Sequence, residues 1–270
     1  MQIPFWKMHG AANDFILVDD RQETFPTHDQ AWLARVMQRR TGIGSEGVLL
    51  IQPSNEADLR MRFFNPDGGE VDMCGNGARC LARLAHELNI APQKLSIETP
   101  AGLVRAEVEG DHVRLHMPEP RDWRLNGTLV LRGEQVPYHY VICGVPHVVI
   151  EVENLDAYDV AKIGEQIRYD KAFQPSGTNA NFIEVTGPDS LRVRTYERGV
   201  EGETLACGTG ITAAGLIAGK LGLVRAPVKV TPASGDVLAV NFKPTDGGAT
   251  SVSLYGPAEH VFKGELEYPG

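Results

Sequence analysis

A weak internal repeat is the feature that most constrains how this chain can fold. Glu, Cys, Gly and Gly stand at the same offsets in two segments, Glu70-Val-Asp-Met-Cys74-Gly75-Asn-Gly77 and Glu203-Thr-Leu-Ala-Cys207-Gly208-Thr-Gly210. A looser echo precedes them, Gly10-x4-Phe15-Ile16-x-Val18 against Gly177-x4-Phe182-Ile183-x-Val185. A repeat of this length predicts two similar halves.

The hydrophobic pattern predicts many short strands and few helices. The clearest helical periods are 29–40, the run after Cys74 to about Leu88, and the run after Cys207 to about Leu221. This balance favours an α+β fold in which antiparallel sheets wrap helices. The apolar pattern lapses between Pro118 and Gly127, where we expect the boundary between the halves.

Each Cys-Gly-x-Gly turn follows a strand-like run and precedes a helix, so each cysteine is expected at a helix N-terminus. The unpaired N–H groups and the dipole there carry roughly half a positive charge, which favours a thiolate and binds a carboxylate. Two such turns facing one another would hold one carboxylate with a sulfur on either face of its α-carbon. Inversion of a stereocentre needs such a pair, one group to remove the proton and one to return it.

The four cysteines, at 74, 80, 143 and 207, are too sparse for a disulfide framework and too irregular for a zinc site. We expect no metal, and we expect Cys80 and Cys143 to be buried small hydrophobes.

The remaining composition limits the partners. With 35 acidic against 26 basic residues the net charge is -9, which disfavours nucleic acid and anionic membranes as partners. The chain shows neither a signal peptide nor an apolar run of membrane-spanning length, so we expect a cytoplasmic protein.

Nearly the whole chain, from Lys7-Met-His-Gly10 to Gly256-Pro-Ala-Glu259, resembles the diaminopimelate epimerase family. The most specific segments are Phe64-Asn65-Pro-Asp-Gly-Gly-Glu70 with Cys74-Gly-Asn-Gly-Ala-Arg-Cys80, and Glu197-Arg198-Gly199 with Glu203-Thr-Leu-Ala-Cys207. The resemblance implies two domains, each a barrel-like sheet around a central helix, with the active site in the cleft between them. It places residues 1–117 and 257–270 in the first domain and 118–256 in the second.

The resemblance also implies roles for single residues. Cys74 and Cys207 match the acid/base pair of an isomerase that interconverts LL- and meso-diaminopimelate without a cofactor, in lysine and cell-wall precursor biosynthesis. The matching substrate-binding residues are Gly75, Asn76, Gly208 and Thr209 at the reacting carboxylate, Asn13, the distal-end residues Asn65, Asn181 and Arg198, and the polar pair His147 and Glu197. The expected partners are this small amino acid and a second copy in a homodimer.

Three departures leave the substrate open. The family commonly has glutamine where Gly47 stands and asparagine where Val145 stands, and the segment from Glu197 to Cys207 is one residue longer than its commonest form. A racemase or epimerase of proline, histidine or glutamate type is therefore an alternative. A non-catalytic amino-acid-binding or redox protein is another. A pyridoxal phosphate enzyme is not favoured, because no lysine stands in a recognisable Schiff-base context.

Overall fold

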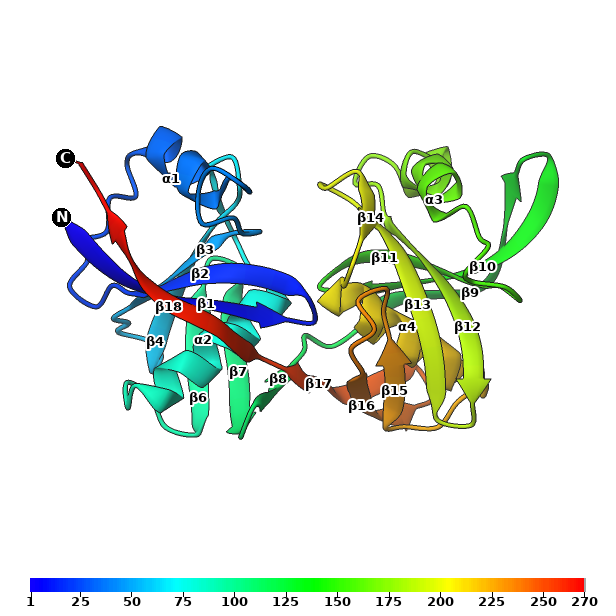
Figure 1. Ribbon diagram of the computed structural model, residues 1–270. Coiled ribbons are helices and arrows are strands. Elements are labelled where there is room, and N and C mark those ends of the chain that lie inside the picture. The colour runs from blue at the N-terminus through cyan, green and yellow to red at the C-terminus, as the bar shows by residue number, and fades with distance from the viewer. Residues whose placement is uncertain (270) are drawn as a thin grey trace. The chain divides into compact units, whose positions relative to one another are not determined.

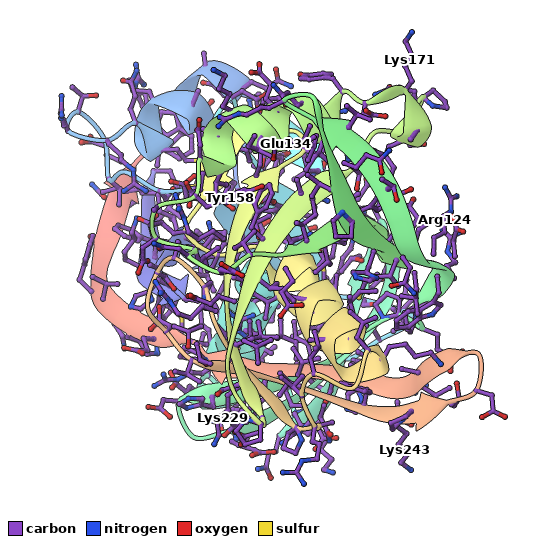
Figure 2. All side chains as sticks on the ribbon, turned by 90° about the vertical axis from the view of Figure 1, so that its right-hand side faces the viewer. Arg124, Glu134, Tyr158, Lys171, Lys229 and Lys243 are labelled. Atoms are coloured by element: carbon purple, nitrogen blue, oxygen red, sulfur yellow. The ribbon has the colours of Figure 1, made fainter. Side chains whose placement is uncertain are left out.

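Alternating exposed and buried side chains explain why most of this chain forms strands. In 228–230 the two valines are buried while Lys229 between them is exposed. Figure 2 shows Lys229 and Lys243 projecting outward from the ribbon of this part of the chain. Because successive side chains point to opposite faces of a strand, such segments bury one face only.

The computed structural model describes residues 1–269 and divides the chain into two compact units (Figure 1). Unit 1 comprises Met1–Leu115 and the segment that begins at Gly256, and unit 2 is His116–Tyr255. No helix among the described residues is both long enough and apolar enough to cross a bilayer.

In unit 1 the β strands form the order β18-β1-β2-β3-β4-β6-β7, with the short β5 also paired to β4. The bounds are β1 Gln2–Gly10, β2 Asn13–Asp19, β3 Val48–Gln52, β4 Leu59–Phe64, β5 Glu70–Val71, β6 Lys94–Thr99, β7 Gly102–Glu109, β8 His112–His116 and β18 Glu259–Glu267. Its helices are α1 Gln30–Met37 and α2 Gly75–Glu87. In Figure 1 the red β18 runs beside the blue β1.

Unit 2 has the same order, β9-β10-β11-β12-β13-β15-β16, with the short β14 paired to β13. The bounds are β9 Arg121–Leu131, β10 Glu134–Cys143, β11 Val145–Glu151, β12 Asn179–Gly187, β13 Ser190–Glu197, β14 Gly202–Thr204, β15 Val228–Thr231, β16 Leu238–Thr245 and β17 Gly248–Pro257. Its helices are α3 Val160–Arg168, the 3-10 turn Lys171–Phe173 and α4 Gly208–Lys220.

The predicted fold of two similar halves, each with strands around a central helix, is confirmed. Every residue of α4 from Gly210 to Ala218 is buried, and α4 contacts six strands of its unit: β10, β11, β12, β13, β15 and β16. A helix that is apolar on all sides is stable only when it is enclosed in this way. In unit 1, α2 takes the equivalent place against β1, β2, β3 and β7.

The sheets are mixed, which corrects the expectation of antiparallel sheets. β2 and β3, and in unit 2 β11 and β12, run parallel because α1 or α3 connects them. β4 and β6, and likewise β13 and β15, run parallel across α2 or α4. A strand that follows a crossover helix returns in the same direction as the strand before the helix.

One further expectation from the sequence is wrong. The looser echo equates Phe15 with Phe182, but Phe15 lies in β2 and Phe182 lies in β12, whose place in the strand order matches that of β3. Apolar runs of this kind are common to all buried strands. The segment 118–127, where we expected the boundary, lies at the start of unit 2, which begins at His116. Most of it is strand, since β9 begins at Arg121, and its largely exposed side chains explain why the apolar pattern lapses.

Truncation of a buried side chain in the central helix should cost more stability than truncation of an exposed side chain in the loop before β16. Ile211 in α4 is fully buried, so Ile211→Ala is expected to lower the free energy of unfolding by about 2–5 kcal/mol. Val237 is 55% exposed, and Val237→Ala should change it by less than about 0.5 kcal/mol. Urea denaturation followed by circular dichroism compares the two variants. Equal losses would show that α4 is not the core of unit 2.

Candidate active site

Both repeat cysteines are N-cap residues of the two central helices, as the sequence predicts. Cys74 precedes α2 with φ −138° and ψ 119°, and Cys207 precedes α4 with φ −106° and ψ 108°. Neither side chain caps its own helix. The first backbone N–H groups of an α-helix have no intrahelical acceptor, so each thiol stands beside a set of donors that suits an anion.

In unit 1 the structure brings three predicted site residues together at the start of α2. The Sγ of Cys74 lies 3.8 Å from the Asn13 side-chain oxygen, which also accepts a hydrogen bond from Asn76 Nδ2 at 3.4 Å. Gly75 has open space where a side chain would stand, which leaves room for a ligand beside the helix end.

Asn65 lies in the tight turn after β4. Its backbone N–H donates to Gly69 O at 2.8 Å, and its carbonyl accepts from the N–H of Gly68, whose φ of +83° favours glycine. Its role at the distal end of a substrate stays a prediction.

In unit 2 a carboxyl group stands beside the second cysteine. The carboxyl of Glu197 accepts a hydrogen bond from the Thr204 hydroxyl at 2.8 Å and one from the Cys207 thiol. Burial raises the pKa of Glu197, against the lowering effect of these hydrogen bonds. The Cys207 Sγ also lies 3.6 Å from the hydroxyl of Thr209. The structure therefore brings Glu197, Cys207 and Thr209 together.

His147 is fully buried, and its Nδ1 lies 3.2 Å from Nδ2 of Asn181. Burial and the nearby Arg198 guanidinium lower the pKa of His147 to about 3, so the ring is neutral. Asn181 is fully buried as well, and its side chain forms hydrogen bonds with His147, Val148 and Thr195 of unit 2. These bonds give no support to its expected role at the distal end of a substrate.

Asn179 is a further polar residue near the site, and the sequence did not predict a role for it. Its side-chain oxygen accepts from the backbone N–H of Arg198 at 2.8 Å, and its Nδ2 donates to Pro146 O at 3.0 Å. The Arg198 guanidinium donates to Ser176 O at 2.7 Å. Asn179 therefore fixes the backbone that carries Arg198. The only signal in the sequence is its place two residues before Asn181.

The second glycine of each Cys-Gly-x-Gly turn is required by close packing. A Cβ at Gly77 would lie 2.9 Å from Leu49 Cδ1, and a Cβ at Gly210 would lie 2.4 Å from Asn181 Oδ1. These contacts are shorter than real Cβ contacts, so a larger residue would force the Leu49 or the Asn181 side chain to shift.

Packing also explains one departure from the family pattern. A Cβ at Gly47 would lie 2.2 Å from the Phe63 ring, so the ring fills the space into which a side chain at 47 would extend.

The expectation for Cys80 and Cys143 is confirmed. Both are fully buried, and burial raises the pKa of each thiol to about 12. They remain protonated at neutral pH and are poor nucleophiles.

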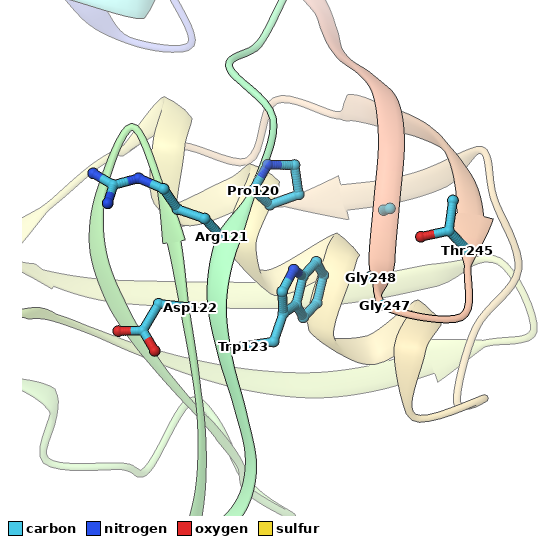
Figure 3. A pocket seen from close by; sticks show the side chains of 8 residues that line it. Pro120, Arg121, Asp122, Trp123, Thr245, Gly247 and Gly248 are labelled. Atoms are coloured by element: carbon cyan, nitrogen blue, oxygen red, sulfur yellow. The ribbon is translucent and has the colours of Figure 1, made fainter.

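One hollow in unit 2 lies apart from these residues. It has a volume of about 420 Å³ and lies between the start of β9 and the turn that joins β16 to β17 (Figure 3). Trp123 and Asp122 line it, and none of the predicted site residues does. Within residues 1–269 no cluster of three or more histidine, cysteine and acidic side chains could hold a metal ion.

The sequence of this chain is similar to those of known proteins over nearly its full length. The diaminopimelate epimerase family model matches residues 5–122 and 139–261. The chain is 41% identical to a diaminopimelate epimerase of Aquifex aeolicus, over 97% of each chain. It is 44% identical to that of Chlorobaculum tepidum, over 96% of this chain and 99% of the relative.

Solved structures share the fold at low identity. A phenazine biosynthesis protein of Bacillus anthracis superposes with a TM-score of 0.75 and 17% identity, over 99% of this chain and 100% of the other. A hydroxyproline epimerase of Agrobacterium vitis superposes with a TM-score of 0.71 and 16% identity, over 98% and 91%. The two diaminopimelate epimerases match nearly the full length of the chain at more than twice the sequence identity of these two structures. The chain therefore belongs to the diaminopimelate epimerase family.

Proposed function

We propose that this protein is a cofactor-independent isomerase that interconverts LL- and meso-diaminopimelate, a step of lysine biosynthesis. The observation that carries the proposal is the position of Cys74 and Cys207 as N-caps of two equivalent buried helices. The diaminopimelate epimerases that it matches at 41% and 44% identity support the choice of substrate.

The proposed reaction moves one proton off the α-carbon and one onto it. The thiolate of one cysteine takes the α-proton, and the electrons of the broken C–H bond pass into the carboxylate, which gains enolate character. The thiol of the other cysteine then donates its proton to the opposite face of the carbon. Nothing is oxidised or reduced, and the reverse reaction exchanges the two roles. Protein groups alone carry each step, so the proposal includes no cofactor.

The helix N-termini supply the electrostatic part of the proposal. Backbone N–H groups that are already oriented stabilise the developing enolate without reorganising, and each donor of this kind contributes about 10²–10³-fold in rate. Gly75 and Asn76 would act on one side and Gly208 and Thr209 on the other, with Asn13 beside Cys74. Glu197, bonded to Cys207, would keep that sulfur oriented.

The distal end of the substrate carries a second ammonium and a second carboxylate. Arg198 is the group we propose for that carboxylate, because its planar fork matches carboxylate geometry. Asn65 would bind beside it.

The location and assembly complete the proposal. We place the enzyme in the cytoplasm, where thiols stay reduced, because none of its four cysteines forms a disulfide among residues 1–269. We also propose a homodimer, which the exposed apolar side chains of Val261 and Phe262 on β18 support.

The substrate is tested by proton exchange. In deuterated water the pure protein should incorporate deuterium at the α-carbon of LL- and meso-diaminopimelate, because reprotonation draws on solvent-exchanged thiol. Mass spectrometry of proline, glutamate and histidine treated in parallel should show none. Exchange into proline, glutamate or histidine alone would assign a different amino acid, and exchange into none would reject the epimerase.

Each cysteine is expected to be essential for epimerisation. Cys74→Ser and Cys207→Ser should each lower kcat by at least about 10²–10⁴-fold, the usual contribution of one general acid or base. Cys80→Ala should leave kcat nearly unchanged, since that thiol is buried and protonated. An enzyme-coupled assay measures epimerisation in both directions. A serine variant with normal kcat would remove its cysteine from the mechanism.

Oxidation tests whether the two sulfurs serve one carbon atom. If they do, mild oxidant should link Cys74 to Cys207 and abolish activity, and reductant should restore it. Peptide mapping identifies the linked pair. A disulfide that involves Cys80 or Cys143, or retained activity in the linked protein, would contradict the proposal.

A further inference from the structure

We propose that Thr195 and Asn181 are positioning residues that hold His147 in the single tautomer with its proton on Nε2. This inference rests on the proposed function, because it gives a task to the histidine beside the Cys207 helix. We call the three residues Thr195, Asn181 and His147 the positioning chain.

Strand register places the positioning chain on one face of the sheet. Asn181 in β12 is opposite Thr195 in β13, and His147 in β11 is paired with Asn179, two residues before Asn181 on the same face. Residues two apart on a strand share a face. This face packs against α4, because a Cβ at Gly210 would lie 2.4 Å from Asn181 Oδ1 and 3.3 Å from Thr195 Oγ1.

The hydrogen bonds fix the orientation of the Asn181 amide. Its Nδ2 donates to the backbone carbonyl of Val148 at 2.8 Å, and a carbonyl can only accept. Its Oδ1 accepts from the Thr195 hydroxyl at 3.0 Å. The two ends of the amide are therefore identified by partners on opposite sides.

The orientation of the amide then sets the tautomer of the histidine. The group that faces Nδ1 of His147 at 3.2 Å is the donor Nδ2, so Nδ1 must accept. A neutral ring that accepts at Nδ1 carries its proton on Nε2. An imidazolium would place two donors against one another at this contact, which agrees with a neutral ring.

The Nε2–H group is left for a ligand. It is fully buried and has no hydrogen-bond partner among residues 1–269. A buried donor without an acceptor costs about 1–3 kcal/mol, so such groups are rare in folded proteins unless they serve a function. The acceptor that fits a buried donor on the sheet face that packs against the first turn of α4 is a carboxylate oxygen, and we assign it to the substrate.

Unit 1 shows that this polar chain is not needed for the fold. When Glu70 is aligned with Glu203, strand pairing makes Phe15 equivalent to His147, Leu49 to Asn181 and Phe63 to Thr195. Phe15 and Phe63 pack edge to face with centroids 6.0 Å apart. The same place in the same fold is therefore apolar beneath Cys74 and polar beneath Cys207.

Nitrogen-15 NMR of the histidine rings at neutral pH tests the inference directly. In the native protein Nδ1 of His147 should be unprotonated and Nε2 protonated, with His147→Gln used to assign its signals. Asn181→Asp replaces the donor that faces Nδ1 with an acceptor of the same shape, so the proton should move to Nδ1 or the ring should become charged. A native ring protonated at Nδ1, or an Asn181→Asp ring unchanged from the native one, would overturn the proposal.

Kinetics separate positioning from a merely structural role. Asn181→Asp should lower kcat about 10- to 100-fold and should change KM by a smaller factor. Removal of a group that donates directly to the reacting carboxylate costs about 10²–10³-fold in kcat, so the effect of a positioning residue should be smaller. Thr99→Val is the matched control, because Thr99 is another buried threonine whose hydroxyl donates one hydrogen bond, to Gly102 O at 2.7 Å. Thr195→Val should lower kcat, and Thr99→Val should not. Equal kcat in the two threonine variants would contradict a positioning role for Thr195.

The outcome for the tautomer does not depend on the substrate. If the native protein exchanges no proton of diaminopimelate but shows the Nε2–H tautomer that Asn181→Asp reverses, the proposed function fails and the positioning chain stands. If it epimerises diaminopimelate and the tautomer is the other one, the positioning chain fails alone.

Discussion

The exposed polar end of a buried helix is the constraint on which each unit depends. Its first N–H groups have no acceptor inside the helix, and the side chains of the strands beneath it lie so close to Gly77 and Gly210 that a larger residue would force them to shift. Neither cysteine side chain caps these N–H groups, although the Cys207 Sγ lies 3.6 Å from the Thr209 hydroxyl in the first turn of α4. An anion such as a carboxylate suits each of these two helix ends, so the repeat provides for binding as well as for packing.

The two units share one topology, while the side chains beneath their central helices differ. The ion pairs Arg62–Glu70 and Arg194–Glu203 hold equivalent places in the two units, and they tie β5 and β14 to the strands beside them. One layer further in, the aromatic and aliphatic packing of unit 1 gives way to the positioning chain of unit 2. Burial of polar side chains costs free energy in unit 2 only. Each buried polar group there needs a hydrogen-bond partner, whereas the apolar side chains of unit 1 need only fill the available space.

The sequence predicted the repeat, the two cysteine caps and the two similar halves, because these depend on local patterns with few solutions. It missed the parallel pairs and β9, since pairing direction follows from crossovers and since a largely exposed strand has little apolar pattern. The contacts of Asn181 and Asn179 could not be foreseen. Both are asparagines in one strand, and only the register shows that one faces His147 and the other bonds to the backbone of Arg198.

Charge presents a last question, because an acidic chain must bind the two carboxylates of a substrate whose two ammonium groups leave it without net charge. The net charge of -9 acts at long range, and salt screens it beyond about 8–10 Å. Attraction must therefore be local, and each group proposed to meet a carboxylate is a donor without negative charge: helix-end N–H groups, neutral His147 and Arg198. A neutral histidine adds direction without adding a proton that could be lost to a thiolate. This combination favours a carboxylate held in one orientation over a strongly bound anion, and orientation is what transfer of a proton across one carbon requires.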